Sequence, residues 1–404
     1  MRQSTSALAL FMGAVAAFQC SSFNTTITVS APSYQPAFAP FANHYQSVAL
    51  LNAVTARDAS TAASPFKGAV NVVETFSISA EYCTPTAYQH PAHLDVQILT
   101  HGLGFDKSYW RFGGDSSGYN YVRAATDAGY ATLSYDRISN GGSSLVDPYT
   151  IQQAPIQLAV LEAITSNFRN ATIHPYVPKP SGKVFHVGHS YGSILSHALV
   201  ATNPSLSDGI VLTGHSTNAT WQGEFLISTN FHLAKENQPQ RSGNRSAGFV
   251  TWADELANQY IFLSYPHFDP AVLAYAETHK YPFSVSEVLT GGVVPYNAAN
   301  FTKPVLMISG DADLIFCGSD CHGILEQAAP LFPAAEPFET YVQPDTGHGM
   351  NLHYNASGTY AVILDFLKSH ALRARRVDGS YAGALREKQY QFLTVKLVIY
   401  LTLS

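Results

Sequence analysis

The chain has 404 residues, of which 46% are hydrophobic and only 12% are charged, and its formal net charge is −6. Ordinary hydrophobic content with little charge excludes an intrinsically disordered chain, and the negative net charge gives no basis for a nucleic-acid partner. A chain of this length buries a large core, either as one enlarged α/β domain or as two domains. The sequence has no HExxH motif and no paired CxxC motifs, so we expect no metal site.

The N-terminus has the pattern of a signal peptide. Arg2 precedes an apolar run over 7–18 that is too short to span a bilayer. Three small residues offer cleavage sites near its end: Ala14, Ala16 and Ala17. We expect a signal peptide over 1–19 and a secreted protein; a first core helix is the alternative. Six N-glycosylation sequons favour secretion: Asn24, Asn170, Asn218, Asn244, Asn300 and Asn355.

The four cysteines also suit an oxidising compartment. Cys317 and Cys321 lie in one short loop, CGSDC, and we expect a disulfide between them. Cys20 and Cys83 can form a second disulfide only if cleavage spares Cys20. Free buried thiols are the alternative.

The first elements follow the predicted signal peptide. Residues 20–68 are rich in Ser, Thr, Ala and Pro, and we expect an N-terminal extension that covers the surface, mostly without regular structure. Alternating apolar residues over 70–82 predict the antiparallel opening strands of a sheet. The next apolar strand, 94–99, runs directly into the sequence HGLG. A strand followed by HG is where the backbone N–H of Leu103 could stabilise an oxyanion; a plain glycine turn is the alternative.

Strands and helices then alternate along the chain. We expect a helix over 121–128 and a strand over 130–135, followed by Asp136 and Arg137 in structural roles, paired with each other or with backbone at strand ends. Asp147-Pro148 predicts the start of a long helix. The alternation favours a parallel sheet with crossover helices on both faces.

The strand over 184–187 leads into the sequence GHSYG and then a helix. A serine between a buried strand and a helix N-terminus lies on a strained turn that exposes its hydroxyl, and the flanking glycines avoid collisions there. We therefore predict that Ser190 is a nucleophile and that the N–H of Tyr191 is the second oxyanion donor. A chance GxSxG in a glycine-bearing loop is the alternative.

After a strand at 209–212, the alternation stops over 216–300. This stretch is rich in aromatic residues, among them Trp221, Phe225, Phe231, Trp252, Tyr260, Phe262, Tyr265, Phe268, Tyr275, Tyr281 and Phe283. It has no strand-like apolar run, and we expect a mostly helical cap over the carboxyl edge of the sheet, where ligands bind in open α/β sheets. The aromatic residues indicate an apolar pocket, although most could form the core of the cap itself.

The sheet resumes at 305–308 and 338–342, and a helix over 360–372 closes it. Asp313 follows the first of these strands and His348 the second, which completes the chain order Ser, Asp, His of a catalytic triad. His348 is the predicted base, with His101 and His353 as competitors. Asp313 is the predicted acid, whereas we expect Asp311 to cap the turn.

The motifs HGLG, YDRISNGGS, GHSYG, GDADLIF and DTGHG together resemble the α/β-hydrolase superfamily, in particular its esterase- and lipase-like members with an inserted cap. The resemblance covers about 70–372 and is strongest to secreted fungal members. It implies a hydrolase core over 69–215 and 301–372 with the cap over 216–300. It also implies that Ser190 is the nucleophile, Asp313 the acid, His348 the base, and Leu103 and Tyr191 the oxyanion donors, with no cofactor.

We therefore expect a serine hydrolase that cleaves a small apolar carboxylic ester or lactone. The same triad could serve acyl transfer, amide cleavage or lyase chemistry, and an inactive binding protein is a further alternative. The tail, 373–404, weakly resembles a lipid-anchor signal, but Lys396 interrupts its apolar end, and we expect no membrane anchoring.

Overall fold

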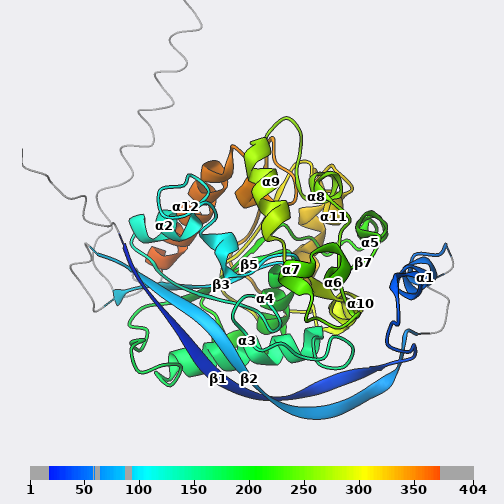
Figure 1. Ribbon diagram of the computed structural model, residues 1–404. Helices are drawn as coiled ribbons and strands as arrows, with labels where there is room; N and C mark the ends of the chain where they lie inside the picture. Colours follow the sequence, from blue (N-terminus) through cyan, green and yellow to red (C-terminus); the bar gives the residue numbers. More distant parts are fainter. Residues whose placement is uncertain (1–17, 58, 60–63, 87–92, 374–404) are drawn as a thin grey trace, which may run out of the picture. The chain divides into compact units, whose positions relative to one another are not determined.

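The computed structural model describes residues 18–57, 59, 64–86 and 93–373. The chain forms two compact units, 1–364 and 365–404, and the described part of the second is the end of helix α12. An eight-stranded sheet organises the first unit, in the order β1-β2-β4-β3-β5-β6-β10-β11 (Figure 1). The expected α/β fold with a mostly parallel sheet is confirmed.

Six strands of this sheet run parallel, and β1 and β2 join its β4 edge antiparallel. Five of the six are buried along their whole length, which explains their mostly apolar sequences. The six parallel strands are β3 (Val96–Thr100), β4 (Ala131–Tyr135), β5 (Val184–His189), β6 (Ile210–Thr213), β10 (Val305–Gly310) and β11 (Phe338–Gln343). The main helices are α2 (Tyr121–Asp127), α3 (Ala154–Arg169), α4 (Tyr191–Thr202) and α12 (Ala356–Arg373), with the short α11 (Leu314–Cys317) after β10.

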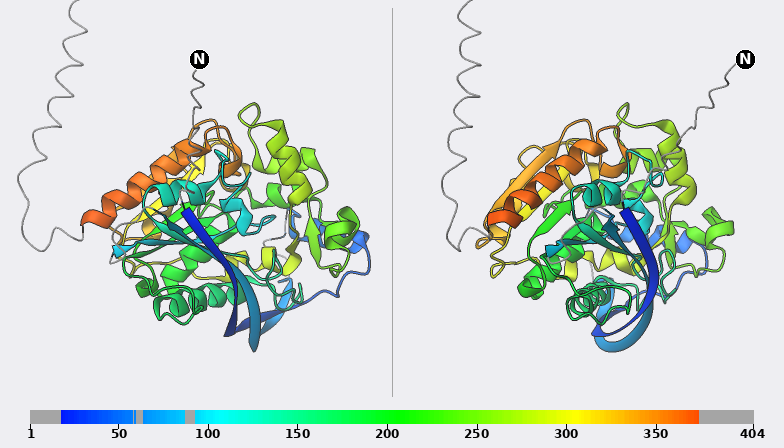
Figure 2. Two further views of the ribbon diagram at one scale, coloured as in Figure 1. Left: turned by 60° about the vertical axis from the view of Figure 1, so that its left-hand side comes forward. Right: turned by 90° about the vertical axis from the view of Figure 1, so that its left-hand side faces the viewer.

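The N-terminal extension has far more regular structure than the sequence analysis expected. Strand β1 covers Phe18–Pro36 and pairs antiparallel with β2, Phe66–Pro85, over nearly its whole length. The two strands form a long curved ribbon that packs along α3 (Figures 1 and 2). A disulfide between Cys20 and Cys83 joins them, and a second joins Cys317 and Cys321 as expected.

The prediction of an irregular extension was wrong because its strand residues are not conspicuously hydrophobic. Alternate residues of β1 are nevertheless buried: Thr25, Ile27, Val29, Ala31 and Ser33. The buried hydroxyl groups have acceptors, since Thr25 donates to the carbonyl of Ile173 and Ser33 to that of Thr150. The period of two and the β-branched residues were the signals of a strand.

Helix α1, His44–Val54, lies between β1 and β2 in the sequence and packs against the cap. Its Leu51 is buried, and the hydroxyl of Ser47 donates to the backbone carbonyl of Phe231 at 3.0 Å. The extension therefore contacts the segment that was expected to cover the active site.

The cap contains a small sheet as well as the expected helices. Strands β7, β8 and β9 form this three-stranded antiparallel sheet, which the prediction of a mostly helical cap did not include. The strands are too short to give an alternating pattern. The cap elements are α5 (Gln222–Thr229), β7 (His232–Leu233), α6 (Ala234–Asn237), α7 (Pro239–Ser242), β8 (Phe249–Thr251), α8 (Glu255–Phe262), α9 (Pro270–His279), β9 (Phe283–Ser284) and α10 (Val285–Leu289).

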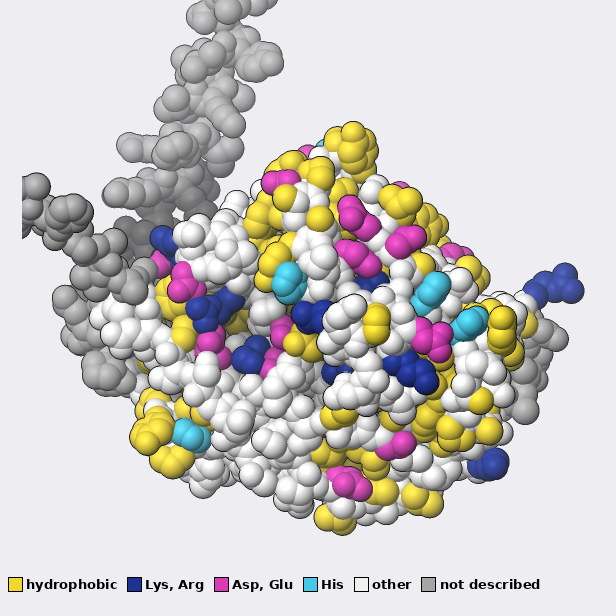
Figure 3. Space-filling view, viewed as in Figure 1, with side chains coloured by type: hydrophobic (Ala, Val, Ile, Leu, Met, Phe, Trp, Pro, Cys, Tyr) yellow, Lys and Arg dark blue, Asp and Glu magenta, His cyan; other side chains and the backbone are white. Residues whose placement is uncertain are grey.

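Hydrophobic side chains are visible at the top of the face in Figure 3, over the cap. Among the cap residues, Leu256, Tyr260 and Tyr275 are exposed. Most of the cap aromatics do not line the candidate site; Trp252 and Phe283, for example, are buried in packing. In the part of the chain that the structure describes, no helix is both long and apolar enough to cross a membrane.

Two local expectations change in the structure. Helix α3 begins at Ala154, not at Asp147, because the Asp147 carboxylate instead accepts from the N–H groups of the turn that follows it. Asp136 and Arg137 do not pair with each other, but the other expected partner, backbone, is confirmed: Asp136 accepts from the N–H groups of Lys107 and Gly142, and Arg137 donates to the carbonyls of His101 and Gly102. Asp136 accepts from Lys107 at 2.6 Å, and Arg137 pairs with Glu287 of the cap.

Candidate active site

Ser190 lies on the turn between β5 and α4, with a positive φ of 54° that side-chain-bearing residues rarely adopt. The turn is so tight that a Cβ on Gly188 would meet the backbone of Gly192, and a Cβ on Gly192 would meet the carbonyl of Thr100. The sequence GHSYG therefore specifies this strained backbone, which holds Ser190 at the carboxyl edge of the sheet.

His348 and Asp313 meet beside this edge, from the loops after β11 and β10. Both side chains are fully buried, and Nδ1–H of His348 donates to Oδ2 of Asp313 at 2.8 Å. Within the described chain, Nε2 of His348 has no hydrogen-bond partner. An imidazole held in this tautomer has a free lone pair on Nε2, which is the requirement for a general base.

Several donors keep the Asp313 carboxylate ionised. Burial raises its pKa, but the charge and hydrogen bond of His348, the hydroxyl of Ser309 at 2.6 Å and the N–H of Phe316 at 3.1 Å together bring the pKa below its ordinary value. An ionised carboxylate at this position orients the imidazole and stabilises its protonated form.

The competing residues have other partners. Asp311 accepts from the backbone N–H groups of Asp345 and Thr346, as expected of a turn cap. Both nitrogens of His353 are used by backbone groups, and burial lowers its pKa to about 4. His101 is likewise bonded through both ring nitrogens.

The two predicted oxyanion donors belong to segments that adjoin Ser190. A Cβ on Gly102 would lie 2.9 Å from Cβ of Ser190, so the HG segment passes directly against the serine. The N–H of Leu103 follows that glycine, and the N–H of Tyr191 is the first of helix α4. Neither amide has a backbone acceptor among the described residues. Free amides at a helix N-terminus and in the adjacent turn can together stabilise a negatively charged oxygen.

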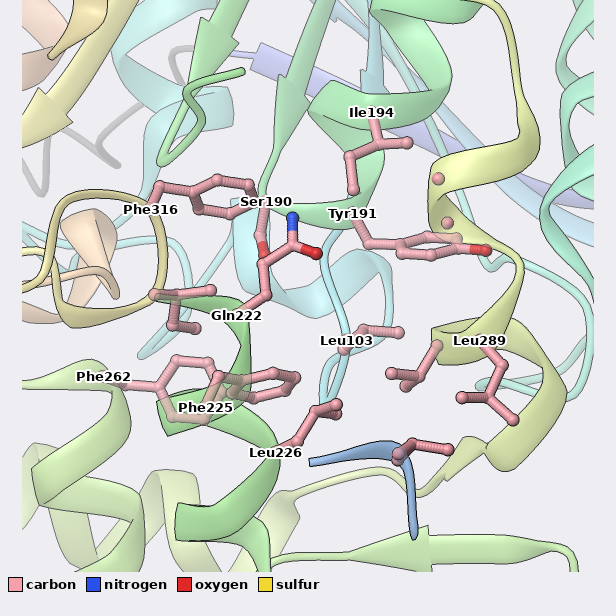
Figure 4. Close-up of a pocket in the computed structure, with 15 residues that line it drawn as sticks. Leu103, Ser190, Tyr191, Ile194, Gln222, Phe225, Leu226, Phe262, Leu289 and Phe316 are labelled. Carbon is pink, nitrogen blue, oxygen red and sulfur yellow. The ribbon is translucent and has the colours of Figure 1, made fainter. Parts of the chain in front are cut away.

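A cavity of about 300 Å³ opens over Ser190 (Figure 4). Its walls are largely apolar and come from the core, the cap and the N-terminal extension: Val54, Leu103, Tyr191, Ile194, Gln222, Phe225, Leu226, Phe262, Val288, Leu289, Gly291, Gly292, Ile315 and Phe316. The rings of Phe262 and Phe316 also lie 5.6 Å and 5.7 Å from the ring of His348. Phe262 and Phe316 therefore line the cavity and also pack beside the imidazole of the predicted base.

Sequence reasoning missed several of these wall residues. Val54 lies in the extension, and nothing in the sequence places it near Ser190. Phe316 lies three residues after Asp313, which is about one helical turn. This spacing from the predicted acid was the signal in the sequence that could have found it. Phe225 and Phe262 were among the cap aromatics and do line the cavity.

Comparisons with known proteins give distant similarities to solved structures and a match to one family. No curated protein matches the sequence significantly. Among solved structures, a thermophilic esterase from Thermogutta terrifontis is 16% identical to this chain. The alignment covers 73% of this chain and 95% of the esterase chain, with a TM-score of 0.49. The proline iminopeptidase of Mycobacterium smegmatis is 17% identical (74% and 97% covered, TM-score 0.49). A monoacylglycerol lipase from Paleococcus ferrophilus is 15% identical (68% and 94% covered, TM-score 0.46).

A sequence profile of the alpha/beta hydrolase family matches residues 97–358, which include both strands that carry the predicted acid and base, the serine turn and the whole cap. This match covers more than half of the chain. The protein therefore belongs to the alpha/beta hydrolase family.

Proposed function

We propose that the protein is a secreted serine hydrolase that cleaves a carboxylic ester or lactone through Ser190, His348 and Asp313. The observation that carries this proposal is the hydrogen bond from His348 to Asp313, which leaves Nε2 unpartnered beside the cavity that contains Ser190. A buried base with an oriented imidazole and no other use is what a serine nucleophile needs.

In the proposed reaction, Nε2 of His348 takes the proton of Ser190 as its Oγ attacks the carbonyl carbon. The carbonyl oxygen becomes an oxyanion, and the N–H groups of Leu103 and Tyr191 stabilise it. Collapse of this intermediate expels the alcohol, which receives its proton from His348. A water molecule that His348 deprotonates then attacks the acyl-enzyme and releases the acid.

The test is turnover of p-nitrophenyl esters of increasing acyl length, measured as release of p-nitrophenol, with a fluorophosphonate probe to label an activated serine. We expect both turnover and labelling. Incorporation of oxygen from isotopically labelled water into the acid would separate hydrolysis from acyl transfer and lyase chemistry. A protein that neither turns over an ester nor reacts with the probe would contradict the enzyme proposal and favour a binding protein.

The apolar cavity favours substrates with a hydrophobic acyl or alkyl group. Substitution of Val54, which lines the cavity, can test how long an acyl chain the cavity accepts. We expect Val54→Trp to lower kcat/KM for long acyl chains about 10-fold or more, with short-chain esters little affected, because a larger side chain would fill space that the chain needs. The matched control is Tyr45→Trp, at an exposed position of the same helix. Equal rates for Val54→Trp and the parent at every chain length would contradict this role of the extension.

Secretion can be tested on the mature chain. The predicted signal peptide over 1–19 leaves Cys20 in the mature chain, where it keeps its disulfide partner Cys83. Mass spectrometry of secreted protein should show an N-terminus at or before Cys20 and a mass loss on glycosidase treatment, since four of the sequon asparagines are exposed: Asn24, Asn170, Asn244 and Asn300. Cleavage beyond Cys20, or no glycan, would contradict this proposal.

A further inference from the structure

Arg137 is an arginine with only 1% of its surface exposed, at the end of β4. Its Nε donates to the carbonyl of His101, and its Nη2 to the carbonyl of Gly102, each at 3.0 Å. Its Nη1 donates to Gln157 at 2.6 Å and to the carboxylate of Glu287. The guanidinium therefore connects the HG segment to the cap.

The carbonyl of Gly102 belongs to the same peptide group as the N–H of Leu103. This peptide is trans and planar, so its C=O and N–H point in opposite directions. An anchor on the oxygen therefore fixes the direction of the Leu103 N–H. A hydrogen bond to the oxygen also polarises the peptide, which makes the N–H a stronger donor.

His101 contributes a second anchor to the same oxygen. Its Nε2 accepts the backbone N–H of Arg137 at 3.0 Å, so the proton is on Nδ1, which donates to the carbonyl of Gly102 at 2.9 Å. Burial, and then the charge of Arg137, lower the pKa of His101 well below its usual value, so the ring stays neutral in this tautomer.

The second oxyanion donor is tied to the same ion pair. The ring of Tyr191 lies 4.9 Å from the guanidinium carbon of Arg137, and its hydroxyl donates to the backbone carbonyl of Glu287 at 3.1 Å. The N–H groups of Leu103 and Tyr191 thus belong to segments that Arg137 and Glu287 contact.

Glu287 comes from helix α10 of the cap and is completely buried. Its carboxylate accepts from Gln152 at 3.0 Å and from Gln157 at 2.8 Å besides Arg137. It also forms a capping box with Ser284, which fixes the start of α10. A buried carboxylate with this many donors is a stable anchor for the guanidinium.

We propose that Arg137 is a positioning residue that aligns the Leu103 N–H with the oxyanion formed at Ser190, and that Glu287 of the cap holds Arg137 in that position. This inference rests on the proposed serine-hydrolase function. In this proposal, the cap has two roles: it lines the substrate cavity, and its Glu287 helps to position an oxyanion donor.

The test compares Arg137→Lys, which keeps the charge but cannot reach both carbonyls, with Glu287→Gln, which keeps the shape and loses the charge. The control is Arg169→Lys. Arg169 also donates to a backbone carbonyl, that of Leu206, and to a carboxylate, that of Asp208, but at the edge of the sheet opposite Ser190. Each variant is assayed with a p-nitrophenyl ester and with a trifluoromethyl ketone. The ketone adds to Ser190, whose proton passes to His348, and its oxygen becomes an anion in the oxyanion hole.

We expect Arg137→Lys to lower kcat about 10- to 100-fold with KM little changed, below the roughly 10²- to 10³-fold loss for complete removal of an oxyanion donor. Binding of the ketone should weaken by the same factor, while the pH profile of kcat/KM keeps its shape because His348 and Asp313 are untouched. Glu287→Gln should show a smaller loss of the same kind, and Arg169→Lys none.

Folded Arg137→Lys and Glu287→Gln proteins with parental kcat and ketone affinity would overturn the inference and leave the proposed function intact. A rise in KM alone would also overturn it, since it would place Arg137 in substrate binding. If Arg137→Lys does not fold, Glu287→Gln decides by the same two measurements. A parent that neither hydrolyses the ester nor binds the ketone would overturn the proposed function, and this inference with it.

Discussion

Replacement of Ser190 with alanine is expected to lower kcat about 10⁶-fold, the loss that removal of a triad serine causes in a well-studied protease. The variant keeps the oxyanion donors and the apolar cavity, so KM for p-nitrophenyl esters should change little. Labelling by a fluorophosphonate should disappear, because the probe reacts with the serine oxygen.

The matched control for this experiment is Ser193→Ala. Ser193 is buried one turn further along α4, and its hydroxyl donates to the backbone carbonyl of Thr213 at 2.8 Å. Its loss should cost about 1 kcal/mol of stability and leave kcat unchanged. A Ser190→Ala protein that retains most of its activity, or a Ser193→Ala protein that is folded and inactive, would contradict the assignment of the nucleophile.

Asp313→Asn is expected to lower kcat about 10⁴-fold, because an amide can hold the imidazole in the wrong tautomer and cannot stabilise its protonated form. Asp311→Asn is the matched control, two residues away in the same loop. Asp311 accepts from two backbone N–H groups at 3.0 Å, so its replacement should reduce stability by about 1–2 kcal/mol and leave kcat near the parental value. The reverse outcome would make Asp311 the acid.

The same variant should change the response of stability to acid. The pKa of Asp313 is lower in the folded protein than its ordinary value, so the ionised carboxylate stabilises the fold above the unfolded-state pKa. This stabilisation is lost as the pH falls through the folded-state pKa. Thermal melts from pH 7 to below about pH 4 should therefore show a steeper loss of Tm for the parent than for Asp313→Asn. Parallel curves would contradict an ionised Asp313.

Much of the core could be predicted from local patterns. Strands β3, β5, β6 and β10 are buried on both faces, so each appears in the sequence as a short, mostly apolar run. The serine turn is equally local, because its geometry excludes side chains at Gly188 and Gly192. Chain order and the position of loops after strands then pointed to Asp313 and His348.

Other features depend on contacts between distant segments. Strand β1 has few strongly apolar residues. Its structure depends on pairing with residues of β2 that lie 30 to 67 positions later, and on the carbonyls that accept its buried hydroxyls. Val54 lines the cavity only because α1 packs on the cap. The sequence contains no short-range signal for either contact.

Arg137 shows the same division most clearly. The sequence by itself determined that an arginine follows strand β4, where strand-end charges usually bond nearby backbone, and two of its partners are indeed the carbonyls at the end of β3. Only the tertiary structure decided that its counter-ion is Glu287, 150 residues further along and in the cap. Local patterns fix which residues form a strand or a tight turn, since those depend on near neighbours in the chain. The partner of a buried charge is decided by the folding of the cap onto the core, because a buried charge must be matched by whatever group that packing brings within reach.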